Sequence, residues 1–109
     1  MAIKANLQID QGADFSTEID VLDDAGEVVD LTGYSGAAQM RKHYTSSTST
    51  AFNVAINASG GSVTLSMNAA TSANVTAGRY VYDCELTSSG NTVSRLVEGI
   101  VTVTPQVTR

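Results

Sequence analysis

Residues 80–86 read Tyr-Val-Tyr-Asp-Cys-Glu-Leu, and apolar side chains occupy every second position, at Tyr80, Tyr82, Cys84 and Leu86. A strand that buries one of its faces has this period of two. The stretch therefore predicts an amphipathic strand whose aromatic inner face lies against the core. The turn-forming residues 88–91 follow it, and the apolar run 92–104 comes next. Together these segments predict a β-hairpin.

The second arm of this hairpin contains a change of phase. Its apolar positions shift from one face to the other around Gly99, which predicts a β-bulge at that glycine. Pro105 has no N–H to donate and is expected to end the strand. If the hairpin turns through a three-residue loop at 89–91, Glu85 lies opposite Arg95.

The same alternation recurs along the rest of the chain, between turns rich in glycine, asparagine and aspartate. Residues 45–50 are all hydroxylic and predict a surface loop, whereas residues 68–78 predict a single helical turn or an irregular crossover. About eight short strands at regular spacing are typical of an all-β sandwich. We expect one domain over residues 1–109. The further strands are expected at residues 3–9, 15–21, 28–31, 38–44, 52–56 and 63–67.

The inward positions of these strands predict the hydrophobic core. Its expected members are Leu7, Phe15, Ile19, Val21, Met40, Val54, Leu65, Tyr80, Tyr82, Leu86, Leu96 and Ile100.

Composition restricts the classes of function. The 109 residues include six basic and eleven acidic side chains, for a formal net charge of -5. This balance argues against proteins that bind nucleic acid by neutralising phosphates and against binding to anionic membranes. No apolar run reaches the length of a signal peptide or a bilayer span, so we expect synthesis as a soluble cytoplasmic product. The only cysteine, Cys84, cannot form an internal disulfide and is expected to be buried and unreactive.

The sequence offers little material for catalysis or for cofactor binding. His43 is the only histidine, so a catalytic triad or a zinc site would depend on this one residue. Eight of the eleven acids fall in the first thirty residues, but their spacing lacks the pattern of a calcium loop. We predict no enzyme activity, no cofactor and no metal. The acidic turn at Asp23 and Asp24 is then simply solvated, and neither calcium nor a chelator should shift the melting temperature.

Two segments are candidate partner contacts. Arg41, Lys42, His43 and Tyr44 form the one basic and aromatic cluster, which fits a rim contact with an acidic partner surface or no contact at all. Residues 104–109 are expected to act as a C-terminal docking arm or to be a frayed terminus. In the docking interpretation, the contact residues of the arm are Pro105, Val107 and Arg109.

Three parts of the sequence together resemble small virion structural proteins of tailed bacteriophages, particularly those of marine and cyanobacterial phages. They are residues 29–34 (Val-Asp-Leu-Thr-Gly-Tyr) with 40–42 (Met-Arg-Lys), residues 78–83 (Gly-Arg-Tyr-Val-Tyr-Asp) and residues 95–103 (Arg-Leu-Val-Glu-Gly-Ile-Val-Thr-Val). Their layout is also similar to the immunoglobulin-like N-terminal domain of phage baseplate upper proteins. The resemblance covers about residues 10 to 104 of the sequence.

This resemblance implies a single immunoglobulin-like antiparallel β-sandwich with a non-enzymatic role in the phage particle. The chain would be synthesised in the host cytoplasm and located in the virion, as a tail or baseplate accessory or a head decoration protein. Its partners would be other phage structural proteins, with a homo-oligomer or symmetric array expected. Because the sequence stops at Arg109, without the long C-terminal region of baseplate upper proteins, an accessory or decoration role is favoured.

A carbohydrate-binding β-sandwich module is the alternative. Such modules usually expose coplanar aromatic rings. This chain has no tryptophan, and Tyr80 and Tyr82 are expected inside.

Overall fold

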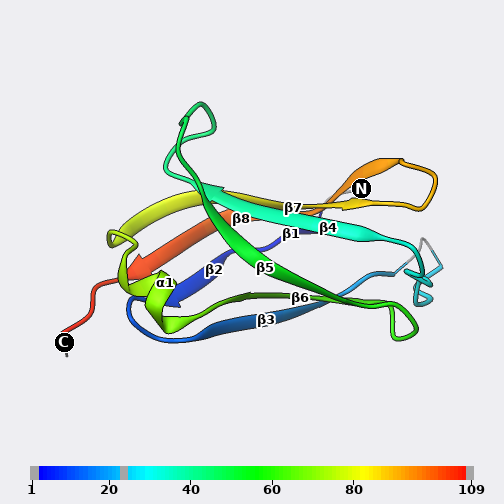
Figure 1. Cartoon of the computed structure of the whole chain (residues 1–109), viewed down its shortest axis with the longest axis horizontal. Helices are drawn as coiled ribbons and strands as arrows, with labels where there is room; N and C mark the ends of the chain where they lie inside the picture. Colours follow the sequence, from blue (N-terminus) through cyan, green and yellow to red (C-terminus); the bar gives the residue numbers. More distant parts are fainter. Residues whose placement is uncertain (1–2, 23–24, 108–109) are drawn as a thin grey trace.

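The structure is a computed structural model that describes residues 3–22 and 25–107. The protein is all-β, as predicted, and one short helix joins two of its strands (Figure 1). In chain order the elements are β1 (Ile3–Lys4), β2 (Leu7–Asp10), β3 (Phe15–Asp20), β4 (Ser35–Arg41), β5 (Thr50–Asn57), β6 (Ser62–Met67), α1 (Ala69–Ala73), β7 (Gly78–Thr87) and β8 (Val93–Thr104).

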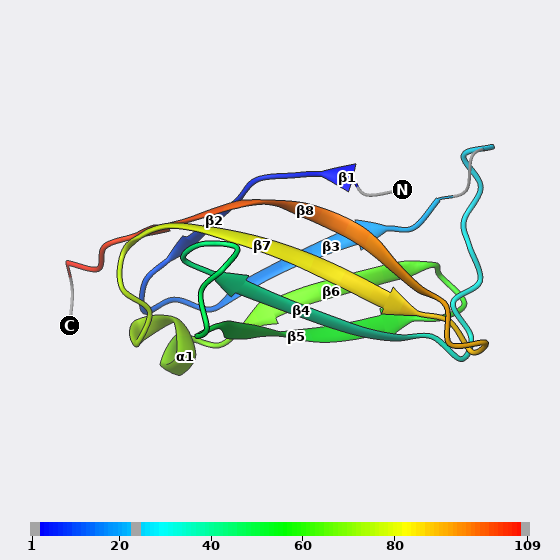
Figure 2. The same ribbon diagram turned by 90° about the horizontal axis from the view of Figure 1, so that it is seen from above.

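The eight strands form one curled sheet in the order β1-β8-β7-β4-β5-β6-β3, with β2 also paired to β8 (Figures 1 and 2). The curl passes through β5. Phe52 in the first half of β5 pairs with Ala38 of β4, whereas Asn53 to Asn57 pair with β6. The sheet thereby encloses a single hydrophobic core, across which the ring of Phe52 contacts those of Phe15 and Tyr82.

The expectation of a purely antiparallel sheet is wrong, because β1 and β2 both run parallel to β8. Alternation in a sequence reports which face of a strand is buried, but it carries no information on the direction of the partner strand. The single strand expected at residues 3–9 is also divided in two. The ladder is interrupted at Ala5 and Asn6, where the chain passes from β1 to β2.

The bulge in β8 lies at Leu96 and not at Gly99 as predicted. Cys84 pairs with Val97 and Glu85 with Arg95, which leaves Leu96 as the extra residue. Gly99 has a different role. A Cβ atom at this position would collide with the carbonyl oxygen of Ala5, so the glycine permits the close approach of the N-terminal segment.

The core is largely composed of the expected residues. Met40, Leu65, Tyr82, Leu86 and Leu96 are buried, and six further predicted members are partly buried against the same cluster: Leu7, Phe15, Ile19, Val21, Val54 and Tyr80. Ile100 is the error, because its side chain is 40% exposed on the outside of β8. The bulge explains this result. Beyond Leu96, the buried positions are Val97, Val101 and Val103, so the even-numbered Ile100 points outward.

Two of the expected strands are shorter than predicted. Residues 28–31 contribute only an isolated bridge between Val28 and Leu22, and β4 ends at Arg41 rather than continuing to Tyr44. Hydrogen bonds outside a regular ladder fix the first segment instead, since the N–H of Leu31 donates to the carbonyl of Ala58.

The crossover between β6 and β7 is the single helical turn α1, one of the two forms predicted for residues 68–78. Asn68 caps it, and its side-chain oxygen accepts a hydrogen bond of 2.8 Å from the N–H of Thr71. Ser72 is fully buried, and its hydroxyl donates to the carbonyl of Ala13, which ties the helix to the β2–β3 connection.

Candidate interaction surfaces

The side of β4, β7 and β8 that faces away from the core is here called the outer face. It presents rows of side chains that cross all three strands. In one row Val81 pairs with both Arg41 and Ile100. In the next row Asp83 pairs with both Gln39 and Glu98. The outer face therefore combines a row that contains two apolar side chains, Val81 and Ile100, with a row of acidic and amide groups.

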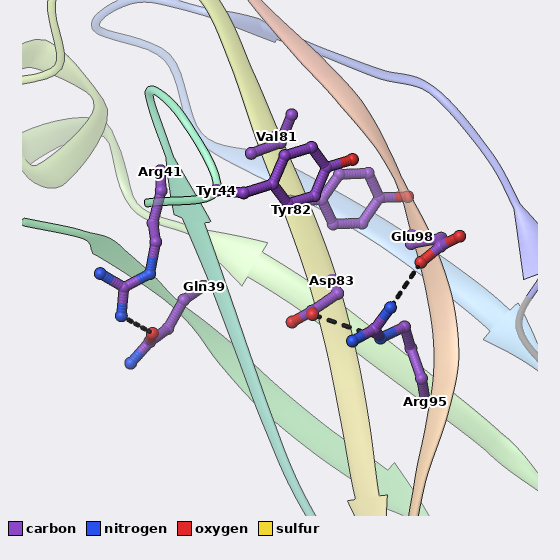
Figure 3. A pocket seen from close by; sticks show the side chains of 8 residues that line it. All are labelled: Gln39, Arg41, Tyr44, Val81, Tyr82, Asp83, Arg95 and Glu98. Carbon is purple, nitrogen blue, oxygen red and sulfur yellow. Dashed lines mark hydrogen bonds and ion pairs between the residues drawn. The ribbon is translucent and has the colours of Figure 1, made fainter. Parts of the chain in front are cut away.

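A hollow of about 260 Å³ opens on this face (Figure 3). Tyr44, on the loop that follows β4, lies at the hollow and is 84% exposed. An exposed aromatic ring beside arginine side chains is the combination that is enriched at protein–protein interfaces. The lining residues are Gln39, Arg41, Tyr44, Val81, Tyr82, Asp83, Arg95 and Glu98.

Arg95 is the electrostatic centre of the outer face (Figure 3). Its Nη1 lies 2.9 Å from Oε2 of Glu98, and its Nε lies 3.4 Å from Oδ2 of Asp83. The hydrogen bond that Arg95 donates to Glu98 and the charge of Asp83 raise the pKa of Arg95. Glu85 pairs with Arg95 across the hairpin, as predicted. Two carboxylates thus pair with one guanidinium, and the charge of Glu85 raises the pKa of Arg95 further, as the smallest of the causes.

The hairpin turn itself has the expected three-residue loop. The N–H of Ser88 donates to the carbonyl of Thr92 at 2.9 Å, and that of Asn91 donates back to Ser88 at 3.0 Å. Asn91 takes the positive φ of 65° that closes such a loop.

The basic and aromatic cluster predicted at residues 41–44 is divided between two sides of β4. Arg41 and Tyr44 line the outer-face hollow. The Nζ of Lys42 instead lies 5.2 Å from the centroid of the Tyr80 ring, and Lys42 lines a different depression. His43 is exposed in the turn between them. Arg41 borders both hollows and so connects the two parts of the cluster.

Arg41 has partners that hold its guanidinium in place. Its Nη1 donates to the carbonyl of Ser46 at 2.6 Å, and its Nη2 donates to Oε1 of Gln39 at 3.1 Å. The Ser46 hydroxyl accepts from the N–H of His43 at 3.0 Å. These bonds fold the loop that carries Tyr44 back onto the end of β4.

Beneath the outer face, Cys84 and Tyr82 point into the core. Cys84 is fully buried, as predicted, and burial followed by the charges of Asp83 and Glu85 raises the pKa of its thiol to about 11. The thiol is therefore protonated at neutral pH, and it packs as a small apolar group. The hydroxyl of Tyr82 donates to the carbonyl of Ala5 at 2.6 Å, and burial raises its pKa to about 12.

The C-terminal segment leaves the sheet after Thr104, which is the last residue of β8 and whose hydroxyl bonds Oδ1 of Asp10 at 2.8 Å. Thr104 thus belongs to the fold rather than to an arm. The N–H of Gln106 donates to Oε1 of Gln11 at 2.9 Å, and Val107 is 91% exposed. Arg109 lies outside the described residues.

Within residues 3–22 and 25–107, no three histidine, cysteine or acidic side chains lie close enough to hold a metal ion. No helix there has the length and apolar character needed to cross a membrane. The acidic turn at Asp23 and Asp24 lies outside the described residues. No protein-family model and no curated protein matches the sequence.

Sequence reasoning missed most of the residues that line the outer-face hollow. The alternation in residues 80–86 marks Val81 and Asp83 only as outward neighbours of buried residues, and it assigns no role to Glu98. A signal for them was present, because the outward residues of adjacent strands become neighbours once the register is known. That register depends on the bulge at Leu96, whereas the alternation in the sequence predicts a bulge at Gly99, three residues further along.

Proposed function

We propose that this protein is a non-enzymatic structural subunit of a bacteriophage particle that acts through protein–protein contacts. The outer face carries the proposal. Its hollow combines the exposed ring of Tyr44 with two arginines, and tyrosine and arginine are residue types concentrated in interface hot spots. The phage assignment is supported by the sequence resemblance of residues 29–34, 78–83 and 95–103 to virion proteins.

We further propose that the sheet is an immunoglobulin-like sandwich. If β3 to β8 are lettered B to G, the strand order gives C-F-G for β4-β7-β8 and B-E-D for β3-β6-β5. These are the neighbours that the immunoglobulin fold requires. The fold also places a tyrosine near the start of strand F, with its hydroxyl bonded to the backbone a few residues upstream. Tyr80 meets this requirement, because its hydroxyl donates to the carbonyl of Thr76 at 2.6 Å.

In this proposal the subunit is a tail or baseplate accessory or a head decoration protein, and its partners are other phage structural proteins. An acidic partner surface suits Arg41, whose fixed guanidinium stands beside Tyr44 at the edge of the hollow. Repetition of such contacts in a symmetric array would make weak individual contacts sufficient.

The first test is an inventory by mass spectrometry of purified particles, separated into heads and tails, from the phage that encodes the chain. We expect the protein in one of the two fractions, at a copy number that matches the symmetry of a shell or ring. Its absence from both fractions would remove the phage assignment.

The second test addresses the outer face. Tyr44→Ala and Ile100→Asp are expected to reduce incorporation into particles while leaving the melting temperature close to that of the wild type, because both side chains are exposed. Ser16→Asp is the matched control, since Ser16 is exposed on β3, away from the outer face. Equal incorporation of all four proteins would contradict the role of this face.

The exposed ring of Tyr44 is also the observation that favours the carbohydrate-binding alternative, because sugars stack on exposed aromatic rings. A glycan array distinguishes the two functions. Glycan binding that Tyr44→Ala abolishes would favour a carbohydrate-binding module, whereas the structural proposal expects no glycan signal.

A further inference from the structure

A second hollow, here called the end hollow, has the apolar lining that the outer-face hollow lacks. Its volume is about 260 Å³, and it lies between β1, β8 and the segment that follows β3. Ile3 and Leu22 line it and are 48% and 53% exposed, and Val28, the bridge partner of Leu22, is 55% exposed. Leu31, Tyr34, Leu86 and Leu96 also line the hollow. Ser94 and Arg95 complete the lining, and the guanidinium of Arg95 is already paired with Asp83 and Glu98. Half-exposed apolar side chains grouped around an apolar hollow mark an interaction site.

The segment that borders the end hollow is acidic. Glu27 and Asp30 are both exposed there, close in sequence to Leu22 and Val28. Hydrogen bonds from the hydroxyl and the N–H of Thr32 lower the pKa of Asp30, so it is ionised at neutral pH. Two copies that met through this end would bring these like charges together, which is unfavourable. The better occupant is an apolar side chain accompanied by a positive charge.

Residues 105–109, here called the C-terminal arm, supply both groups. Val107 is 91% exposed, and Arg109, although outside the described residues, adds the cation. The arm leaves the molecule at the end opposite to the segment that follows β3 (Figures 1 and 2). Along β8 the eight residue-to-residue steps from Leu96 to Thr104 cover about 26 Å at the rise of a strand. Five residues extend over at most about 18 Å, so the arm cannot enter the end hollow of its own molecule.

We propose that the end hollow binds the C-terminal arm of a second copy of this chain, with Val107 inserted among the apolar side chains and Arg109 beside the acidic segment. β1, which carries Ile3, is an edge strand of the sheet. An extended arm can therefore also add to β1 through main-chain hydrogen bonds. The contact joins two different surfaces, and repetition of it gives a ring or a filament. The inference rests on the proposed assembly function and names a partner for it.

Sedimentation velocity of the full chain over a range of concentrations tests this contact. The wild type is expected to increase in mass with concentration. Val107→Asp removes the inserted side chain and Leu22→Asp places a charge in the hollow, so each variant alone should remain monomeric. Ser16→Asp is the matched control, because it adds the same charge at an exposed position of β3 that lines neither hollow. This control should associate like the wild type.

An equimolar mixture of the two monomeric variants gives the sharpest result. Val107→Asp retains an intact hollow and Leu22→Asp retains an intact arm, so the mixture should form a dimer and grow no further. A wild type that stays monomeric, self-association of Val107→Asp, or a mixture that stays monomeric would overturn the inference. Circular dichroism checks that Leu22→Asp is folded, and Ile3→Asp replaces it if it is not.

The outcome is independent of the test of the proposed function. A monomeric chain that is nevertheless found in particles would remove the arm contact and leave the structural role. A chain that associates in solution but is absent from particles would keep the arm contact and remove the structural role in the particle.

Discussion

Tyr82 connects the sheet to the N-terminal segment through a single side chain. Its ring packs edge-on against Phe52, with centroids 6.1 Å apart, and its hydroxyl bonds the carbonyl of Ala5. We expect Tyr82→Phe to lower the free energy of unfolding by about 1 kcal/mol, the net contribution of one hydrogen bond. Tyr82→Ala should cost about 3 to 5 kcal/mol, because it also empties part of the core.

Equilibrium unfolding in urea measures both variants of Tyr82. If the phenylalanine variant is as stable as the wild type, the hydrogen bond to Ala5 contributes nothing. A cost near zero for the alanine variant would mean that the strand phase of β7 is inverted.

Cys84 and Tyr82 make the fold sensitive to alkaline pH. Burial raises the pKa of Cys84 from 9.0 to about 11 and that of Tyr82 from 10.0 to about 12. Above pH 9 the unfolded chain loses a thiol proton that the folded chain retains, so the unfolded state binds fewer protons and stability falls as pH rises. The contribution of the protonated Cys84 thiol to the free energy of unfolding is fully present below pH 9 and is progressively lost toward pH 11.

The measurement is the free energy of unfolding below pH 9 and near pH 11, for the wild type and for Cys84→Ala. The variant has a smaller core side chain, so its loss of stability between the two pH values is compared and not its absolute stability. We expect a smaller loss in the variant. Equal losses in the two proteins would show that the thiol does not titrate differently in the folded and unfolded states.

Much at this scale could be predicted from the sequence. The burial of Tyr82 and Cys84 followed from strict alternation, which is reliable wherever a strand has one buried face. Ile100 was assigned to the wrong face, because one extra residue reverses every later position in a strand. The face that Ile100 occupies is thus decided by the bulge at Leu96, which is seen only in the structure.

At the scale of elements, the crossing of the N-terminal segment over β8 is the feature that alternation could not predict. The N–H of Ala5 donates to the carbonyl of Glu98, and the side-chain oxygen of Asn6 accepts from the N–H of Ile100. Gly99 lies between these two bonds, and its missing Cβ leaves room for the Ala5 carbonyl. The glycine was recognised as special in the sequence, but a glycine in a strand indicates a bulge or a close approach equally well.

Gly99→Ala tests this crossing. The added methyl collides with a backbone oxygen that cannot move without displacing β1 and β2, so we expect a loss of about 1 to 3 kcal/mol, as in overpacked cores. Urea unfolding gives the loss, and hydrogen exchange should show faster exchange at Ala5 and along β2. Gly90→Ala is the control, because a Cβ there meets only the Ser88 hydroxyl, at 3.9 Å. Equal stability of the two variants would contradict the close approach.

For the whole molecule, the two hollows show why a candidate site is harder to predict than a fold. The core residues follow a local rule within each strand, whereas each hollow collects residues from segments that are distant in sequence. Ile3 comes close to Leu96 in the end hollow because β1 pairs in parallel with β8, and Leu22 joins them from the segment that follows β3. The sequence does predict that residues 104–109 are separate from the sheet, because Pro105 cannot donate the hydrogen bond that would continue the strand. The arm begins one residue later than predicted, because Thr104 completes β8.

The last prediction separates the stability of the domain from its assembly. Removal of residues 107–109 leaves Gln106 and its bond to Gln11 in place and deletes only the exposed Val107 and the two residues beyond it. We expect the melting temperature to change by no more than about 2 °C, because a shift of 4 °C or more already corresponds to about 1 kcal/mol in a domain of this size. Incorporation into particles should nevertheless fall, since the shortened arm lacks Val107, the side chain that is proposed to contact a neighbour. Calorimetry and quantitative mass spectrometry of particles provide the two readouts, and Ser16→Asp again serves as the control. A truncated protein that assembles like the wild type would leave the sheet faces and loops as the assembly contacts, while a large drop in melting temperature would make residues 107–109 part of the fold.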